Sequence, residues 1–232
     1  MFHPQVRSVI LMVALSGAVV GTAAAQVPDK AKVCNQVTSR EPTMGAWASY
    51  KWTGGQAGGT TTRMAVVGKE PHEGTTYYWF EMSIEDAKRP AGKMIVQTLV
   101  PGLFASGRVR AGVMKAGDQP AMKMPPQMIQ MINSNPSMNV SSEIARQCLA
   151  MEVVGWETVN VTAGQFKALH MRTGQDVVSD VWVQPDMPFA MVKATLKDGG
   201  VMELMGQGTG AKSSITETPV DMPGMPGARP PR

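Results

Sequence analysis

The chain has only two cysteines and three histidines among its 232 residues. No histidine or second cysteine stands at ligand spacing beside either cysteine, which argues against a zinc site and against a cysteine nucleophile. The Gly-x-Ser-x-Gly, Ser-x-x-Lys, His-Glu-x-x-His and phosphate-loop motifs are also absent. We therefore expect no enzyme and no cofactor, because the common hydrolase, protease and nucleotide sites need those motifs.

Charge is also scarce. Charged residues make up 17% of the chain and the formal net charge is only +4, which is too weak to indicate a nucleic-acid partner or attraction to an anionic membrane. With 43% apolar residues the chain is expected to fold rather than remain disordered. Peripheral contact with a membrane remains open, and no protein partner is indicated.

A long apolar run occurs only at the N-terminus. Arg7 precedes an almost unbroken apolar stretch from Val9 to Val20, and Thr22-Ala-Ala-Ala25 ends in small residues. This pattern predicts a signal peptide over residues 1–25 and a periplasmic mature protein. The alternative, a membrane anchor, needs about 20 apolar residues, and this run is shorter.

The two cysteines, Cys34 and Cys148, are predicted to form a disulfide. Exported proteins meet an oxidising compartment, where a pair of cysteines usually forms one bridge. In the alternative, Cys148 packs as a small apolar side chain beside Ile144, one helical turn away.

Short segments that alternate apolar and polar residues dominate residues 26–218, which we interpret as one domain. The pattern is typical of an antiparallel sheet. In Thr76–Ile84, for example, Tyr78, Phe80 and Met82 alternate with Trp79 and Glu81. About ten such strands are expected, at 47–52, 62–68, 76–84, 93–100, 151–161, 165–173, 177–183, 190–197, 201–206 and 211–216.

Three short helices are expected beside this sheet. One begins at Asp29 and runs to about Thr38, one follows Pro125-Pro126 and ends between Asn133 and Pro136, and one begins at Ser141 or Ser142. The helical insertion between early and late strands predicts an α+β fold, with a strongly curved antiparallel sheet that forms an incomplete β-barrel covered by two or three helices. Residues 219–232, rich in Pro and Gly, are expected to be a disordered tail.

Twenty methionines are the chemical peculiarity of the chain. Met124, Met128, Met131 and Ile132 fall on one stripe of the expected second helix. Three readings stay open: plain core packing, a flexible lid over an apolar cavity, and, with Met122 added, a Cu(I) site of thioethers. His170 alternates with Phe166 and Ala168, which favours a half-buried sheet residue over a catalytic base.

The segments Val161-Thr-Ala-Gly-Gln-Phe-Lys-Ala-Leu-His170 and Val181-Trp-Val-Gln-Pro-Asp-Met-Pro-Phe189 resemble the C-terminal meander of bacterial envelope proteins of the lipoprotein-carrier superfamily, the LolA and LolB type. The resemblance covers roughly Trp156 to Ile215. It implies a half-barrel whose concave apolar face takes acyl chains, and an Arg on the sheet that latches the helical lid. No local motif selects among the candidates for that latch, which are Arg63, Arg89, Arg108, Arg110 and Arg172.

We therefore expect a periplasmic binding or carrier protein for a hydrophobic or amphipathic ligand, such as a lipid or a lipoprotein acyl chain. The expected ligand site combines residues of the second helix with residues of the sheet, namely Met124, Met128, Met131, Ile132, Phe80 and Met82. The alternatives are a non-catalytic structural or assembly protein of the envelope and a methionine-rich copper-binding protein.

Overall fold

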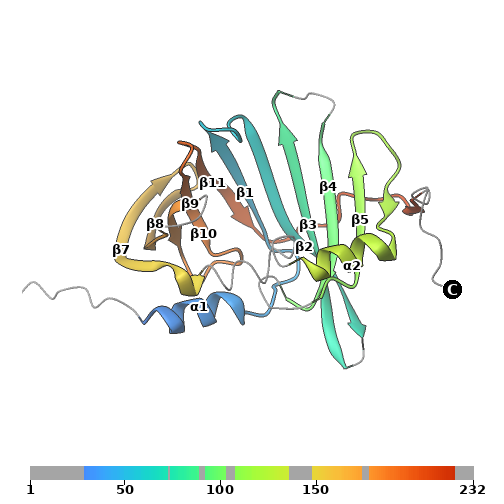
Figure 1. Ribbon diagram of the computed structural model, residues 1–232, viewed down its shortest axis with the longest axis horizontal. Helices are drawn as coiled ribbons and strands as arrows, with labels where there is room; N and C mark the ends of the chain where they lie inside the picture. Colours follow the sequence, from blue (N-terminus) through green and yellow to red (C-terminus); the bar gives the residue numbers. More distant parts are fainter. Residues whose placement is uncertain are drawn as a thin grey trace, which may run out of the picture.

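The computed structural model describes residues 29–222, except 73, 89–91, 103–107, 136–147 and 174–177. The expected signal peptide, the start of the third helix and Arg89 lie outside these residues. One sheet of twelve strands dominates the fold, open between β12 and β7 and strongly curved (Figure 1). The expected α+β fold with a curved, incomplete barrel is confirmed, with twelve strands rather than about ten.

Two antiparallel meanders meet in the middle of this sheet. The strand order is β12-β6-β5-β4-β3-β2-β1-β11-β10-β9-β8-β7, so β1 and β11 join the N-terminal meander to the C-terminal one. All pairs are antiparallel except β12 with β6. The strands are β1 Trp47–Thr53, β2 Thr60–His72, β3 Thr75–Asp86, β4 Met94–Val100, β5 Ala111–Ala116, β6 Met122–Lys123, β7 Glu152–Val161, β8 Gly164–Arg172, β9 Val178–Val183, β10 Met191–Leu196, β11 Val201–Gly208 and β12 Val220–Asp221.

The sheet curls most strongly at its β7 end. The amide of Ala163, in the β7–β8 turn, donates to the carbonyl of Leu204 in β11 at 3.1 Å. The main apolar core lies inside this curl and includes Tyr50, Leu169, Met171 and Leu204, all almost fully buried. The curvature therefore lets one sheet enclose much of its own core.

Helix α1 (Lys30–Thr38) covers part of that core, as predicted. Asp29 caps it by accepting a bond from the Ala31 amide at 2.9 Å, which satisfies an otherwise orphan donor of the first turn. Its buried face consists of Val33, Cys34 and Val37. The predicted disulfide between Cys34 and Cys148 is confirmed; it ties α1 to residues 148–150, which are helical.

The two faces of β3 separate as the alternation predicted. Tyr78, Phe80 and Met82 lie on the side of the main core, which we call the inner face. Trp79 and Glu81 lie on the opposite, outer face. Glu81 is only 1% exposed, so the more polar face of this strand is also covered.

The cover of the outer face is the C-terminal strap, defined as residues 209–219. It runs behind β3 and β4 towards β5 (Figure 1), where Ile215 joins Ile95, Val113 and Ala121 in a second small core. Residues 211–216 were expected to be a strand. They form none, because the side chains of Ser213 and Ser214 bond to Gln97 and Glu81 of the sheet in place of a backbone ladder.

After the strap, β12 pairs with β6, and the amide of Val220 donates to the carbonyl of Ala121 at 2.9 Å. This pairing extends past residue 219, where the tail was expected to begin. Residues 223–232 lie outside the described part of the chain.

Candidate functional site: a pocket beneath α2

Helix α2 (Pro126–Ser134) follows β6 in the chain and is seen across the lower part of the β4 and β5 region in Figure 1. Pro125 occupies the N-cap position and Pro126 begins the helix, as the Pro-Pro pair predicted. Just before it, the amide of Met124 donates to the carbonyl of Gly112 in β5 at 2.8 Å. At the other end, the Asn133 side chain bonds to both backbone groups of Val109 at 2.8 Å each. One end of α2 is therefore attached to β5, and the other to Val109, two residues before that strand.

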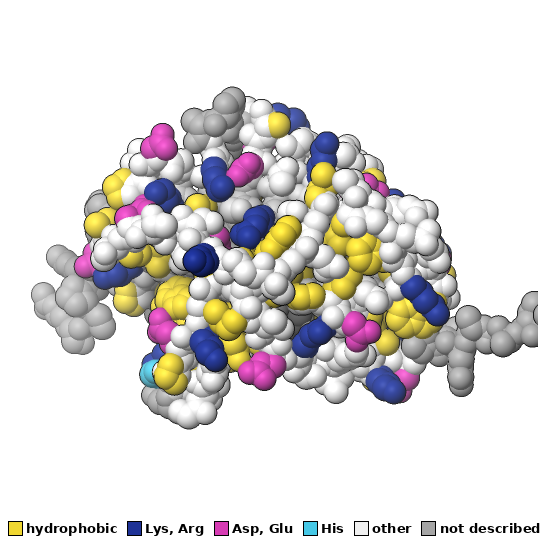
Figure 2. Space-filling view, turned by 180° about the vertical axis from the view of Figure 1, so that it is seen from behind, with side chains coloured by type: hydrophobic (Ala, Val, Ile, Leu, Met, Phe, Trp, Pro, Cys, Tyr) yellow, Lys and Arg dark blue, Asp and Glu magenta, His cyan; other side chains and the backbone are white. Residues whose placement is uncertain are grey.

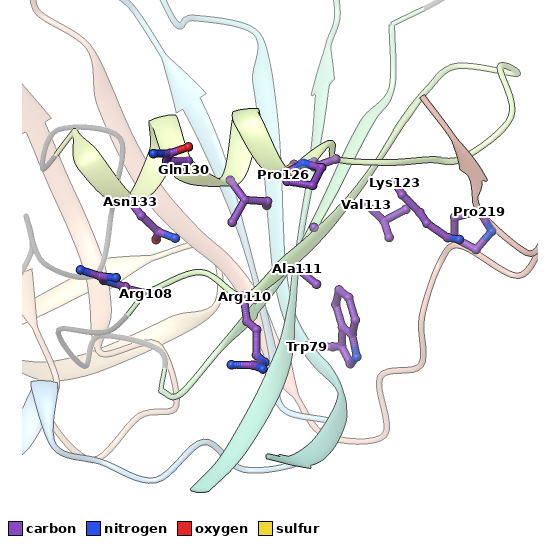
Figure 3. A pocket seen from close by; sticks show the side chains of 13 residues that line it. Trp79, Arg108, Arg110, Ala111, Val113, Lys123, Pro126, Gln130, Asn133 and Pro219 are labelled. Carbon is purple, nitrogen blue, oxygen red and sulfur yellow. The ribbon is translucent and has the colours of Figure 1, made fainter. Parts of the chain in front are cut away.

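An open pocket of about 790 Å³ lies between α2 and the part of the sheet formed by β3, β5 and β6. Figure 3 shows the helix above Trp79, Arg108 and Arg110. The pocket is lined by Trp79, Arg108, Arg110, Ala111, Gly112, Val113, Lys123, Met124, Pro126, Ile129, Gln130, Asn133 and Pro219.

The floor of the pocket is apolar. Trp79 and Ala111 are register partners of Leu99 and share the outer face with Val113, while Ile129 faces them from α2. Gly112 lets the Met124 side chain lie directly against β5, because a β-carbon at residue 112 would collide with the thioether of Met124. The floor therefore favours an apolar group of modest size.

The rim of the pocket is cationic. Arg108, Arg110 and Lys123 belong to the lining, and no Asp or Glu is among its described residues. Lys123 pairs with Asp221 at 3.3 Å, and the Arg110 guanidinium lies 5.8 Å from the centroid of the Tyr77 ring. Elsewhere acidic and basic side chains are interspersed, as on the face shown in Figure 2. Three basic side chains therefore lie around one pocket.

The structure does not bring the predicted helix residues together in this pocket. Met124 lines it, but Met128, Met131 and Ile132 do not; Met128 and Ile132 are half-buried and Met131 is 48% exposed. The turn of α2 that faces the sheet instead presents Ile129. Helical spacing shows which residues share one side of α2. It does not show which side faces the sheet, because two sides of this short helix carry apolar residues.

The predicted sheet residues, Phe80 and Met82, lie on the inner face and so on the other side of the sheet from Trp79. Both are half-buried, and the Phe80 ring lies 6.0 Å from the ring of Phe189. Phe80 therefore packs against the main core.

Met64 and Met114 were not predicted to lie near Met82 and Met122, because their proximity depends on strand register. Met64 is the partner of Met82, which pairs with Val96; Val96 pairs with Met114, and Met114 with Met122. This row crosses five strands of the inner face. Only knowledge of which strands pair reveals it, since Met64 and Met122 are far apart in the sequence.

Two of the arginines that were candidates for the latch, Arg108 and Arg110, lie near helix α2. Arg63 lies over the ring of Trp47 at 5.2 Å, and Arg172 bonds to Asp180 at 2.8 Å. Arg108 and Arg110 are the two that line the pocket beneath α2.

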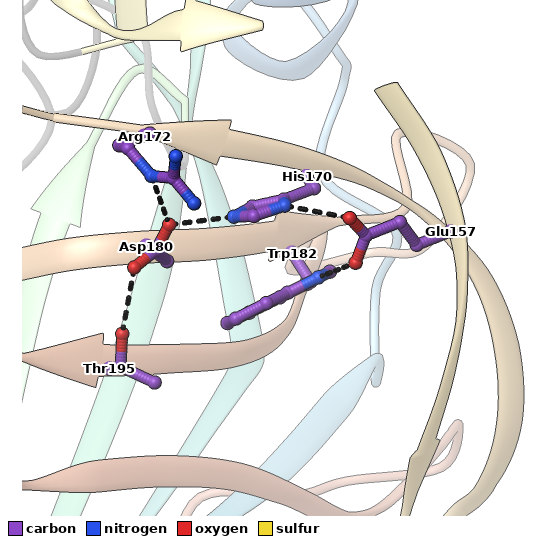
Figure 4. Close-up of polar contacts among 6 residues, drawn as sticks. All are labelled: Glu157, His170, Arg172, Asp180, Trp182 and Thr195. Atoms are coloured by element: carbon purple, nitrogen blue, oxygen red, sulfur yellow. Dashed lines mark hydrogen bonds and ion pairs between the residues drawn. The ribbon is translucent and has the colours of Figure 1, made fainter. Parts of the chain in front are cut away.

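A second polar cluster lies on β7 to β10 (Figure 4). His170 is 6% exposed, and its ring nitrogens lie 2.8 Å from Glu157 Oε1 and 2.7 Å from Asp180 Oδ1. Trp182 stacks on the imidazole, with centroids 4.5 Å apart, and donates to Glu157 Oε2 at 2.8 Å. Each ring nitrogen of His170 therefore has a carboxylate oxygen as its hydrogen-bond partner.

The two carboxylates of this cluster have lowered pKa values. The indole N–H of Trp182, followed by the bond to His170, lowers the pKa of Glu157. Burial raises the pKa of Asp180, but the bonds from His170 and Arg172 outweigh it, so that its pKa is also below the ordinary value. These contacts join β7, β8 and β9.

Within the described residues, no helix is long and apolar enough to cross a membrane. The same residues contain no group of three or more His, Cys, Asp or Glu side chains arranged to hold a metal ion.

Comparison with known proteins gives a distant likeness only. No family model and no curated protein sequence matches the chain. A chain of the Pseudomonas aeruginosa MucA/MucB complex is 12% identical with a TM-score of 0.47, over 81% of this chain and 59% of that one. A structure of MucB in complex with MucA(peri) is 11% identical with a TM-score of 0.44, over 80% of this chain and 57% of that one. A Bacteroides fragilis exported protein with a YmcC-like fold is 12% identical with a TM-score of 0.33, over 73% of this chain and 98% of that one. The chain thus spans less than two thirds of the MucB-complex chains that it resembles.

Proposed function

We propose that this protein is an exported, non-catalytic binding protein that holds a hydrophobic or amphipathic ligand in the pocket beneath α2. The observation that carries the proposal is the pocket itself, about 790 Å³ in volume, with an apolar floor between α2 and β5. Small-molecule sites typically occupy roughly 300–1,000 Å³ and combine an apolar lining with a few polar groups. A lipid or a lipoprotein acyl chain is the ligand class that the sequence resemblance implies.

The packing of α2 suits a movable cover. None of its residues is fully buried, and its ends are attached by a few bonds, including the amide of Asn133. Elements with few buried contacts open at low free-energy cost. Such opening would admit a ligand without unfolding the sheet.

An oxidising compartment agrees with the Cys34–Cys148 disulfide and with the expected signal sequence at residues 1–25. A binding role is favoured over catalysis because the buried His170 already faces a carboxylate at each ring nitrogen. The rival proposal, an envelope assembly protein without a small ligand, makes no use of the pocket.

The two sides of α2 provide a matched test. Ile129 lines the pocket, whereas Met131, two residues away on the same helix, is exposed and does not. Binding of a neutral naphthylamine dye, which fluoresces in apolar surroundings, is measured for the wild type, Ile129→Asp and Met131→Asp, with thermal unfolding as the control for folding.

We expect Ile129→Asp to weaken dye binding at least tenfold, because it places a charge on the apolar floor, and Met131→Asp to leave the affinity within about twofold. Loss of binding in Met131→Asp alone would show that the opposite stripe of α2 contacts the ligand. Absence of dye binding to the wild type would favour the assembly role.

A further inference from the structure

We infer that the ligand of this pocket is an amphipathic anion, whose carboxylate or phosphate group is held by Arg108 and Arg110 while its apolar part covers Trp79 and Ile129. The inference rests on the proposed function, since it concerns the same pocket. It adds the sign of the ligand's charge and the two residues that select it.

The two arginines are held in place by their backbone. They flank Val109, which is only 6% exposed, and an extended chain points residues i and i+2 to the same side. The amide of Arg110 donates to the carbonyl of Leu99 at 2.9 Å, and Asn133 of α2 bonds to both backbone groups of Val109. Asn133 thus acts as a positioning residue that joins the helix to the arginine pair.

Among the described residues, Arg108 and Arg110 lack the acidic counter-charge that the paired basic residues of the protein have. Arg172 pairs with Asp180, Lys193 with Glu203, and the pocket's own Lys123 with Asp221. No ion pair with an acidic side chain is found for Arg108 or Arg110 within the described part of the chain, and no acidic residue lines the pocket. An anionic group on the ligand would provide that counter-charge.

The chemistry of the guanidinium group suits this role. It is planar, always charged, and matches carboxylate and phosphate oxygens with two parallel N–H donors. The Arg110 group lies over the ring of Tyr77, a contact that orients it. Because Trp79 and Ile129 line the same pocket, a ligand with an anionic head and a single apolar chain meets both requirements.

The test uses three soluble amphiphiles of equal chain length, decanoate, decyl phosphate and decyltrimethylammonium, with binding measured by calorimetry on the disulfide-bonded protein. The variant is Arg108→Gln/Arg110→Gln. Its charge-matched control is Lys51→Gln/Lys69→Gln, since both lysines are exposed and neither lines the pocket.

We expect the wild type to bind the two anions at least tenfold more tightly than the cation. Arg108→Gln/Arg110→Gln should raise the anion Kd at least tenfold, which equals about 1.4 kcal/mol, while the lysine control stays within about twofold. The melting temperature of the arginine variant should match the wild type, because both arginines are exposed.

The outcomes separate this inference from the proposed function. Equal affinity for the anions and the cation, with dye binding intact, would overturn the anion inference and leave the pocket function standing. Failure of every amphiphile and the dye to bind would overturn both. If the arginine variant lost sedimentation with anionic phosphatidylglycerol vesicles but kept its affinity for decanoate, the pair would serve a membrane surface, and the pocket inference would be wrong.

Discussion

Glu81 provides the most demanding test of the packing, because it is a carboxylate with 1% exposure that anchors the C-terminal strap to the outer face. It accepts three hydrogen bonds, from Gln97 Nε2 at 2.7 Å, from the Ser214 amide at 2.9 Å and from Ser214 Oγ at 2.7 Å. Glu81→Ala removes all three of these hydrogen bonds. One N–H group of the buried Gln97 side chain is then left without a hydrogen-bond acceptor. The strap should loosen as a result.

The expected loss can be estimated from these bonds. Hydrogen bonds to charged groups contribute about 1.5–3 kcal/mol each, but their sum overstates the effect because Ser214 lies at the surface and can bond to water. We expect Glu81→Ala to lower the free energy of unfolding by about 3–5 kcal/mol, within the range for broken buried networks. At about 2–4 °C per kcal/mol for a protein of this size, the melting temperature should fall by roughly 6–20 °C.

Glu81→Gln is the matched control. Its amide oxygen can accept the bonds from Gln97 and the Ser214 amide, and its NH₂ group can donate to the Ser214 hydroxyl, so it should lose no more than about 1 kcal/mol. Unfolding in urea measures both variants, and tryptic cleavage after the exposed Lys212 reports release of the strap. A Glu81→Ala variant within about 1 kcal/mol of the wild type, with no faster cleavage, would refute the anchoring role.

Two further predictions concern the disulfide and the cluster around His170. Reducing the Cys34–Cys148 bridge, which spans 114 residues, should stabilise the unfolded state by about 4.8 kcal/mol through the chain entropy that it regains. The melting temperature should therefore fall by roughly 10–20 °C. An unchanged melting temperature would mean that α1 is held by packing alone. The lowered pKa values of Glu157 and Asp180 imply stabilisation that is complete above their unfolded pKa values, near pH 4, and is lost as the pH falls through the lower folded values. The unfolding free energy should therefore fall more steeply below about pH 4 in the wild type than in Glu157→Gln/Asp180→Asn, and parallel curves would contradict the prediction.

Some features of this protein follow from local sequence alone. Alternation in Thr76–Ile84 identified β3 and the division of its two faces, because successive side chains of a strand point to opposite sides. The Pro125-Pro126 pair and Asp29 marked the starts of α2 and α1, since capping depends on neighbouring residues only. The disulfide followed from counting, because there are only two cysteines.

Strand β5 lies in a stretch, residues 104–119, whose pattern indicated mixed strand and loop without bounds, and β6 and β12 were not predicted; the reasons are physical. Ala111–Ala116 is mixed in composition and gains its strand conformation from pairing with β4, while β6 and β12 are two residues each and exist only through their partners. Residues 211–216 show the reverse case. Their alternation resembles a strand, yet the side chains of Ser213 and Ser214 find better partners on the sheet.

The candidate site depended almost entirely on the tertiary structure. The sequence by itself determined the strand alternation, the helix starts and an abundance of methionine, all of which are set by neighbours along the chain. The tertiary structure decided that Ile129 rather than Met131 faces the pocket, that Arg108 and Arg110 meet Trp79 there, and that the polar face of β3 is buried beneath residues 209–219. Each of these depends on contacts between segments far apart in the sequence, and only the register of the sheet and the path of the strap bring those segments together.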